Sequence, residues 1–177
     1  MEDAGNIPVT RERIQEIIAT FGDPAIENRH AAVAALKEIG EPAIAPLIAA
    51  IATAEDNDRR SYAAVSLTRI GEPSILPLIM AMEKNTDRSF RKYAAAALGE
   101  IGEQAADSLI DGMASDDQEL RGFLSQALCR IGKPAVEHLT LRLDDPDETI
   151  RQCANLTLWQ MGEEGISEIV ENVNKEK

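Results

Sequence analysis

Arginine and aspartate recur at fixed positions along the chain, and a carboxylate near a guanidinium is a pairing that active sites can use. Five arginines follow one another at intervals of 31, 31, 30 and 30 residues: Arg29, Arg60, Arg91, Arg121 and Arg151. Four of them have an aspartate four positions earlier: Asp56, Asp87, Asp117 and Asp147. A catalytic group need not appear in every repeat, so we interpret the aspartates as helix caps. They are also expected to form a charge ladder with the arginines, with one rung missing where Ala25 replaces the first aspartate.

The sequence contains little evidence for a metal site or for a catalytic nucleophile. His30 and His138 lie in repeats far apart, and repeats advance by about 10 Å each, so these side chains cannot share one ion. Cys129 and Cys153 have no second cysteine at metal-binding spacing. The chain contains no Gly-x-Ser-x-Gly elbow, phosphate-binding loop or dinucleotide fingerprint. We therefore predict a protein that is not an enzyme, with no catalytic residue, no metal site and no cofactor.

Charge and composition narrow the class of partner. The 177 residues include 31 acidic and 18 basic side chains, which gives a formal net charge of −13. This charge argues against binding to nucleic acid or to an anionic membrane surface. The start, Met1-Glu2-Asp3, lacks the basic segment of a signal peptide, and the longest apolar run, Ala43–Ala54, is too short to span a bilayer. With only two cysteines, the sequence predicts a soluble cytoplasmic protein.

The elements that position these residues are helices in pairs. A helix carrying each arginine ends at a glycine, which can adopt the left-handed conformation that closes a helix: Gly40, Gly71, Gly102, Gly132 and Gly162. Proline follows two residues later in three repeats and is compatible with the first turn of the next helix: Pro42, Pro73 and Pro134. A leucine seven positions after each arginine marks the core: Leu36, Leu67, Leu98, Leu128 and Leu158.

One helix pair cannot bury its own apolar stripe, so the pairs must stack. The sequence predicts eleven helices and no strand: a first helix over residues 10–21 and then five pairs. The predicted fold is an all-α solenoid of about five stacked pairs of 30 or 31 residues. We expect a single domain over residues 1–177, with an N-terminal segment and first helix over 1–22, repeats over 23–173 and a frayed tail over 174–177.

The repeated pattern resembles a known family. An aspartate turn, an arginine, alanines, a leucine and then Ile-Gly-Glu-Pro-Ala resemble the HEAT-like repeats first described in phycobilisome lyases, and the similar scaffolds of engineered binding proteins. The resemblance covers about residues 23–173 and implies that the arginine-bearing helices line the concave side of the solenoid. Hydroxylases built from such repeats, which modify deoxyhypusine, bind iron through His-Glu pairs. Here Ala31 follows His30 and Leu139 follows His138, so that motif is absent.

One column of the repeat varies strongly in volume. Two positions after each arginine the chain has Ala31, Tyr62, Tyr93, Phe123 and Cys153. A densely packed interior position cannot easily accept both alanine and tyrosine, so this column is expected on the surface. The alternative is that the aromatic side chains fill gaps between repeats.

Helical angles place further variable positions beside this column. The predicted partner-binding residues are Tyr62, Val65, Arg69, Tyr93, Phe123, Gln126, Arg130 and Leu156. Aromatic residues and arginine are favoured as anchors in binding interfaces. Three glutamates are expected to form an acidic rim: Glu38, Glu100 and Glu119. The partner is therefore predicted to have an apolar centre and basic edges.

Three functions fit these observations. The first is a protein–protein interaction scaffold that binds a protein or peptide on the concave face of the solenoid. The second, motivated by the family resemblance alone, is a bilin lyase subunit or a lyase-like chaperone of a tetrapyrrole-bearing protein. The third is a purely structural spacer, which predicts that no partner is recovered. We favour the scaffold because a regular framework here carries a column of variable aromatic residues.

Overall fold

The computed structural model describes residues 10–163 and 165–167, and within these ranges the regular structure is helical, with no strand. The chain is an all-α solenoid, as predicted. Its contacts divide it into two compact units, Met1–Ile70 and Gly71–Lys177. The expected single domain over residues 1–177 stays a prediction, and the expected frayed tail over 174–177 lies outside the described residues.

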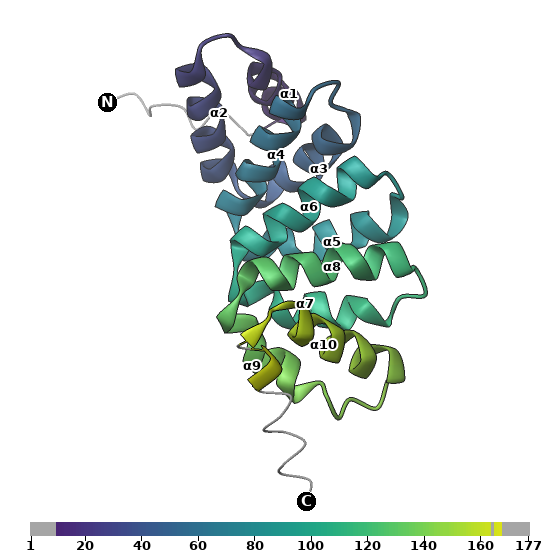
Figure 1. Cartoon of the computed structure of the whole chain (residues 1–177). Coiled ribbons are helices and arrows are strands. Elements are labelled where there is room, and N and C mark those ends of the chain that lie inside the picture. The colour runs from purple at the N-terminus through teal and green to yellow at the C-terminus, as the bar shows by residue number, and fades with distance from the viewer. Residues whose placement is uncertain (1–9, 164, 168–177) are drawn as a thin grey trace, which may run out of the picture. The chain divides into compact units, whose positions relative to one another are not determined.

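In its described residues the first unit has four α-helices in two layers (Figure 1). Helices α2 and α4, which carry arginines, lie side by side, and α1 packs against both α2 and α3. The bounds are α1 Arg11–Ala19, α2 Ile26–Ile39, α3 Ile44–Thr53 and α4 Asn57–Ile70. The predicted first helix therefore exists, and a 3₁₀ turn over Thr20–Gly22 completes it.

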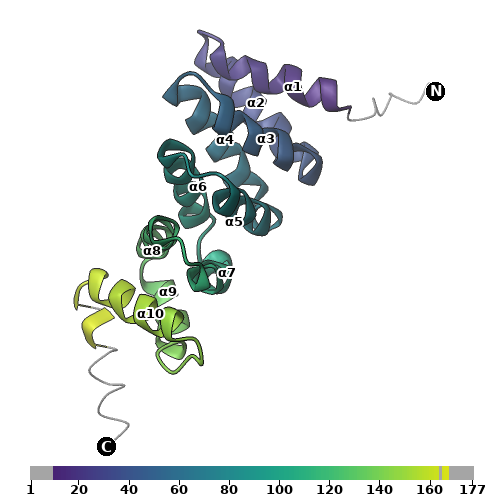
Figure 2. The same ribbon diagram turned by 90° about the vertical axis from the view of Figure 1, so that its right-hand side faces the viewer.

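The second unit repeats the arrangement. Helices α6, α8 and α10 form the arginine-bearing layer, and α5, α7 and α9 form the other (Figure 2). The bounds are α5 Ile75–Lys84, α6 Arg88–Ile101, α7 Ala106–Asp111, α8 Gln118–Ile131, α9 Lys133–Leu141 and α10 Glu148–Gln160. Beyond Gly162, residues 163 and 165–167 are helical and begin the eleventh predicted helix.

The predicted signals for the ends of the helices are confirmed. All five repeat glycines have a positive φ, between 71° and 92°, and the N–H of Gly40 donates to the carbonyl of Leu36 at 3.1 Å. Pro42 and Pro73 lie in 3₁₀ turns, Glu41–Ala43 and Glu72–Ser74, that lead directly into α3 and α5. The first four arginine-bearing helices therefore end directly before the repeat glycine, as predicted, whereas α3 and α5 begin two residues after the prolines.

The predicted core is also confirmed. The leucine seven positions after each arginine is fully buried in all five repeats: Leu36, Leu67, Leu98, Leu128 and Leu158, each at 0% exposure. Small residues beside it allow close approach of neighbouring helices, for example Ala94 and Ala154, both at 0%. None of the described helices combines the length and the apolar character needed to cross a membrane.

Candidate functional site

The repeated aspartates cap helices, as predicted. Asp56 accepts a hydrogen bond from the backbone N–H of Arg59, and Asp87 accepts one from Phe90. Asp117 and Asp147 each accept two backbone N–H groups at the starts of α8 and α10. Ala25, in the first copy, provides no such cap. These carboxylates therefore satisfy backbone donors that a helix start leaves unpaired, which is a structural role.

Four of the five repeated arginines bind backbone carbonyls rather than forming a continuous charge ladder. Arg121 donates from Nη1 to the carbonyl of Ser115 at 2.7 Å, and Arg151 donates to that of Asp145 at 2.6 Å. Arg60 donates from Nε to the carbonyl of Ile51 at 3.3 Å. In these repeats the guanidinium thus fixes the segment that precedes its own helix, whereas Arg29 lies over the ring of Tyr62 and its Nη1 is 3.8 Å from Oδ2 of Asp58. The predicted continuous ladder of aspartate–arginine ion pairs is therefore wrong.

One rung of the ladder is present, at Arg91. This side chain is fully buried, and its Nη2 lies 2.6 Å from Oδ2 of Asp117 in the following repeat. Its Nε also donates to the carbonyls of Met82 and Asn85, at 3.1 and 2.9 Å. Arg91 therefore joins two repeats of the second unit through charge-assisted hydrogen bonds.

The Arg91–Asp117 pair predicts a specific response to acid. The hydrogen bond from Arg91, followed by that from the Leu120 N–H, lowers the pKa of Asp117 from its ordinary 3.8 to about 2. A carboxylate with a depressed pKa in the folded state contributes stability above the unfolded pKa, and this contribution is lost as the pH falls through the folded value. Asp117→Asn should therefore be less stable than the unaltered chain at pH 7, and the difference should shrink between about pH 4 and pH 2.

Urea unfolding at a series of pH values measures this difference directly. Asp116→Asn is the matched control, because Asp116 is the exposed neighbour and no hydrogen bond from Arg91 reaches it. A stability gap between Asp117→Asn and the unaltered chain that stays constant down to pH 2 would contradict the role assigned to this pair.

The cysteines and histidines do not form a reactive centre. Burial raises the pKa values of both the Cys129 and the Cys153 thiols, which disfavours the reactive thiolate at neutral pH. His138 lies 3.1 Å from Asp107, whereas His30 lies beside Tyr62 in the other unit. Among the described residues, no group of three or more His, Cys, Asp or Glu side chains is placed to hold a metal ion.

The aromatic column is not the exposed surface that the sequence predicted. Phe123 is only 8% exposed and belongs to the core of the second unit. Its predicted solvent accessibility is therefore wrong. Tyr93 is half-buried.

Tyr62 shows why the volume argument failed. Its ring stacks on Phe21 with the centroids 5.8 Å apart, and the guanidinium of Arg29 lies over the ring, 5.1 Å from its centroid. Phe21 precedes the first arginine helix, so the tyrosine fills a gap toward the preceding turn of the stack. Large and small residues can alternate at such a position because the neighbouring repeat differs too. The gap-filling alternative therefore describes Tyr62 and Phe123 better.

The other predicted partner-binding residues are exposed. Within the first unit, Val65 is 43% exposed, and Arg69 follows one turn later on α4. The adjacent helix α2 exposes His30, Ala34 and Glu38 at the corresponding positions. We call these five residues the α2–α4 face. In the second unit the predicted residues Gln126, Arg130 and Leu156 are exposed on α8 and α10.

Arg130 already has partners within the chain. Its Nε lies 2.8 Å from Oε1 of Glu100 on α6. Its side chain also occupies the space above Gly99, since a Cβ added there would meet Arg130 carbons at 2.7 to 3.0 Å. Arg130 therefore fills a gap left by a glycine, and contact with a partner would compete with these interactions.

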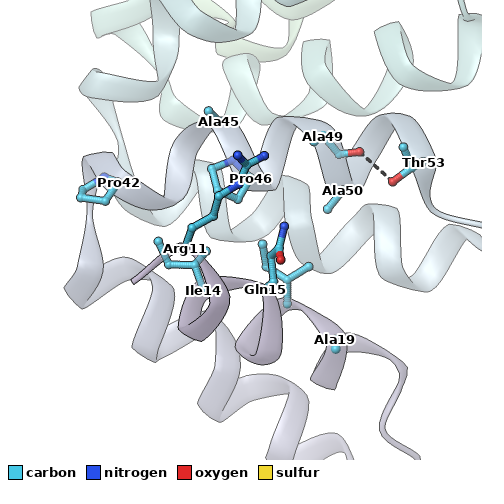
Figure 3. Close-up of a pocket in the computed structure, with 11 residues that line it drawn as sticks. Arg11, Ile14, Gln15, Ala19, Pro42, Ala45, Pro46, Ala49, Ala50 and Thr53 are labelled. Atoms are coloured by element: carbon cyan, nitrogen blue, oxygen red, sulfur yellow. Dashed lines mark hydrogen bonds between the residues drawn. The ribbon is translucent and has the colours of Figure 1, made fainter. Parts of the chain in front are cut away.

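A groove between α1 and α3 was not predicted. It has a volume of about 740 Å³, and small apolar residues of α3 line it together with residues of α1, among them Ile14 (Figure 3). The lining residues are Arg11, Ile14, Gln15, Ile18, Ala19, Pro42, Ala45, Pro46, Ala49, Ala50 and Thr53. Arg11 is the one charged residue among them, so the groove can hold an apolar group with an anionic group beside it. The signal in the sequence was the apolar run Ala43–Ala54, whose small residues do not all fit into a core.

Parts of this sequence match two families of repeats, and the fold is similar to that of solved structures. Residues 44–121 match the family described as HEAT repeats, and residues 29–53 match that described as PBS lyase HEAT-like repeat. No curated protein matches the chain in sequence. One similar solved structure is the complex of CpcE and CpcF of phycocyanin lyase from Nostoc sp. PCC7120, with 22% identity, a TM-score of 0.41 and coverage of 90% of this chain and 88% of that one. Another is an engineered protein, with 19% identity, a TM-score of 0.34 and coverage of 92% and 86%.

Proposed function

We propose that this chain, which carries HEAT-like repeats, is a non-enzymatic scaffold that binds a protein partner on the side lined by its arginine-bearing helices. One contrast carries the proposal. Columns with a structural role repeat the same residue type, as the leucine and arginine columns do. The exposed columns of the α2–α4 face differ between the two helices: Ala34 against Val65, and Glu38 against Arg69. The residue type thus differs from repeat to repeat at exposed positions, which are the positions that a partner can contact.

The residue types on the α2–α4 face indicate which properties a partner should have. Val65 is an exposed apolar side chain, and Arg69 and Glu38 lie one turn beyond the Val65 and Ala34 positions. The chain as a whole carries a net charge of −13, which attracts a partner with basic edges and speeds encounter at low salt. The resemblance to HEAT-like repeats implies that this side is the concave one. The proposed partner is therefore a protein or peptide with an apolar centre, basic edges and a convex shape.

Site-specific cross-linking tests the proposal. A photoreactive amino acid placed at Val65 should cross-link to one protein in an extract of the source cells, with a yield that falls as salt is added. The matched control places the same amino acid at Leu141, which is 73% exposed on α9 of the other layer. Identical products from both positions, or no product from Val65, would contradict a partner on the α2–α4 face.

A second candidate function rests on the match of residues 29–53 to the PBS lyase HEAT-like repeat. It is that of a lyase subunit, or a lyase-like chaperone, for a tetrapyrrole-bearing protein. Mixing the purified chain with a bilin and recording its absorption spectrum distinguishes this function from the first. An unchanged spectrum would count against it, and the cross-linking result would then stand alone.

A further inference from the structure

The groove between α1 and α3 lies within the first unit and is large enough for a small molecule. Its volume of about 740 Å³ falls within the range of about 300–1,000 Å³ that is typical of small-molecule sites. A smaller hollow of about 220 Å³ adjoins it and reaches Phe21. Four residues line both spaces: Ile18, Ala19, Ala50 and Thr53. No residue of the α2–α4 face lines either space, so the groove is separate from the proposed partner-binding face.

The groove is open because small residues occupy positions that connect helices elsewhere in the chain. Helices α1 and α3 flank α2 along the chain, as α7 and α9 flank α8. Six and ten positions after its repeat glycine, α9 has His138 and Arg142, whose side chains lie 3.1 and 2.8 Å from carboxylates of α7. The same two positions of α3 are Pro46 and Ala50, which line the groove (Figure 3). Their short side chains leave the space beside α1 unfilled.

One end of the groove is positively charged. The lining residues that the structure describes include no aspartate or glutamate, although the chain has 31 of them, and they include one cation, Arg11. The neighbouring Arg13 is paired with Glu16 at 3.1 Å. Arg11, by contrast, is exposed and forms no ion pair or hydrogen bond within the described part of the chain. Its guanidinium is therefore available to an anionic group in the groove.

The other end has the opposite preference. Glu55 lines the smaller hollow, and Arg59, which also lines it, has its Nε 3.3 Å from Oδ2 of Asp56. An anion is thus disfavoured at this end. Between the two ends the hydroxyl of Thr53 already donates to the carbonyl of Ala49 at 2.9 Å, so the lining there is mainly apolar. The nine residues of α1 make this apolar stretch about 13 Å long.

We propose that the groove binds a single-chain amphiphile, which is an unbranched alkyl chain with a carboxylate at one end. The carboxylate lies beside Arg11, and the alkyl chain runs between α1 and α3 toward Phe21. Each methylene group removed from water strengthens binding by up to about fourfold. The preference for an anion comes from Arg11, because the net charge of −13 repels anions from the chain as a whole. This site is independent of the proposed scaffold function.

Titration of the full chain with hexanoate, octanoate and decanoate tests the proposal, with backbone amide shifts followed by NMR. Up to about 10 mM ligand, a range suited to weak binding, the amides of α1 and α3 should shift and saturate. Affinity should rise by about two- to fourfold for each added methylene group. Octylammonium has the same alkyl chain with a positive charge, and it should bind at this site about threefold or more weakly than octanoate. Added salt should reduce that difference, because it screens Arg11.

Matched variants make the test specific to the groove. Arg11→Gln should weaken octanoate binding by about threefold or more, and Arg13→Gln, beside it on α1 but outside the lining, should not. Ala49→Trp fills the groove and should abolish binding, whereas Ala52→Trp, at an exposed residue of α3 outside the lining, should leave it unchanged.

Three results would overturn the proposal. The first is the absence of saturable shifts with decanoate. The second is binding that survives Ala49→Trp, which would place the ligand elsewhere on the chain. The third is octylammonium binding in the groove as tightly as octanoate, since Arg11 would then not select an anion. Thermal melts of each variant show that the fold is kept.

Discussion

Replacing Arg91 by alanine is expected to lower the free energy of unfolding by about 3 kcal/mol or more. The guanidinium is fully buried, and its removal leaves the carbonyls of Met82 and Asn85 without their donor. It also removes the charge partner of Asp117, which otherwise joins α6 to the start of α8. Urea unfolding followed by circular dichroism measures the loss.

Two variants separate the causes of that loss. Arg91→Met keeps most of the buried side-chain volume and removes the hydrogen bonds, so the part of the loss that remains in this variant belongs to the polar contacts. Arg60→Ala is the matched control from the same column, since Arg60 is only half-buried and donates to the Ile51 carbonyl at 3.3 Å. It should lose less than about 1 kcal/mol. Equal losses for Arg60→Ala and Arg91→Ala would show that burial of Arg91 has no special consequence.

Replacing Phe123 by alanine should lower the free energy of unfolding by about 3–5 kcal/mol, the range for truncation of a buried phenylalanine. The side chain is 8% exposed in α8, so its loss leaves a cavity that the surrounding helices only partly close. Thermal melts and urea unfolding both report this change.

The exposed neighbour Gln126, one turn later on α8, provides the control. Gln126→Ala should change stability by no more than about 0.5 kcal/mol, as is usual for exposed positions. If Phe123→Ala cost less than about 1 kcal/mol, the residue would not be part of the core. The original prediction of an aromatic binding column would then regain its basis.

The repeat architecture could be predicted because five copies of one pattern stand in a single chain. The glycines with positive φ, the aspartate caps and the buried leucines each depend on local chemistry that recurs at a fixed spacing. The helix bounds follow from these signals, for example the end of α2 at Ile39 before Gly40. Local causes of this kind are readable from the sequence.

The partners of individual side chains could not be predicted in the same way. The column two positions after each arginine varies from alanine to tyrosine because the contact outside its own repeat varies with it, as the stacking of Tyr62 on Phe21 illustrates. Arg130 lies over Gly99 for the same reason, since the glycine leaves space that only the neighbouring helix can reveal. The residues of one column do not reveal whether a neighbouring element fills the space beside them. The arginine contacts to backbone carbonyls were missed similarly, because a carbonyl has no signature in the sequence.

The affinity of the partner cross-linked at Val65 tests the proposed scaffold function most directly. The purified partner is titrated with the unaltered chain, with Val65→Asp and with Leu141→Asp, which places the same charge on an exposed residue of α9. The account predicts saturable binding to the unaltered chain, a loss of about 10-fold or more for Val65→Asp, and little change for Leu141→Asp. Equal loss for both variants, or no saturable binding to the unaltered chain, would contradict a binding site on the α2–α4 face.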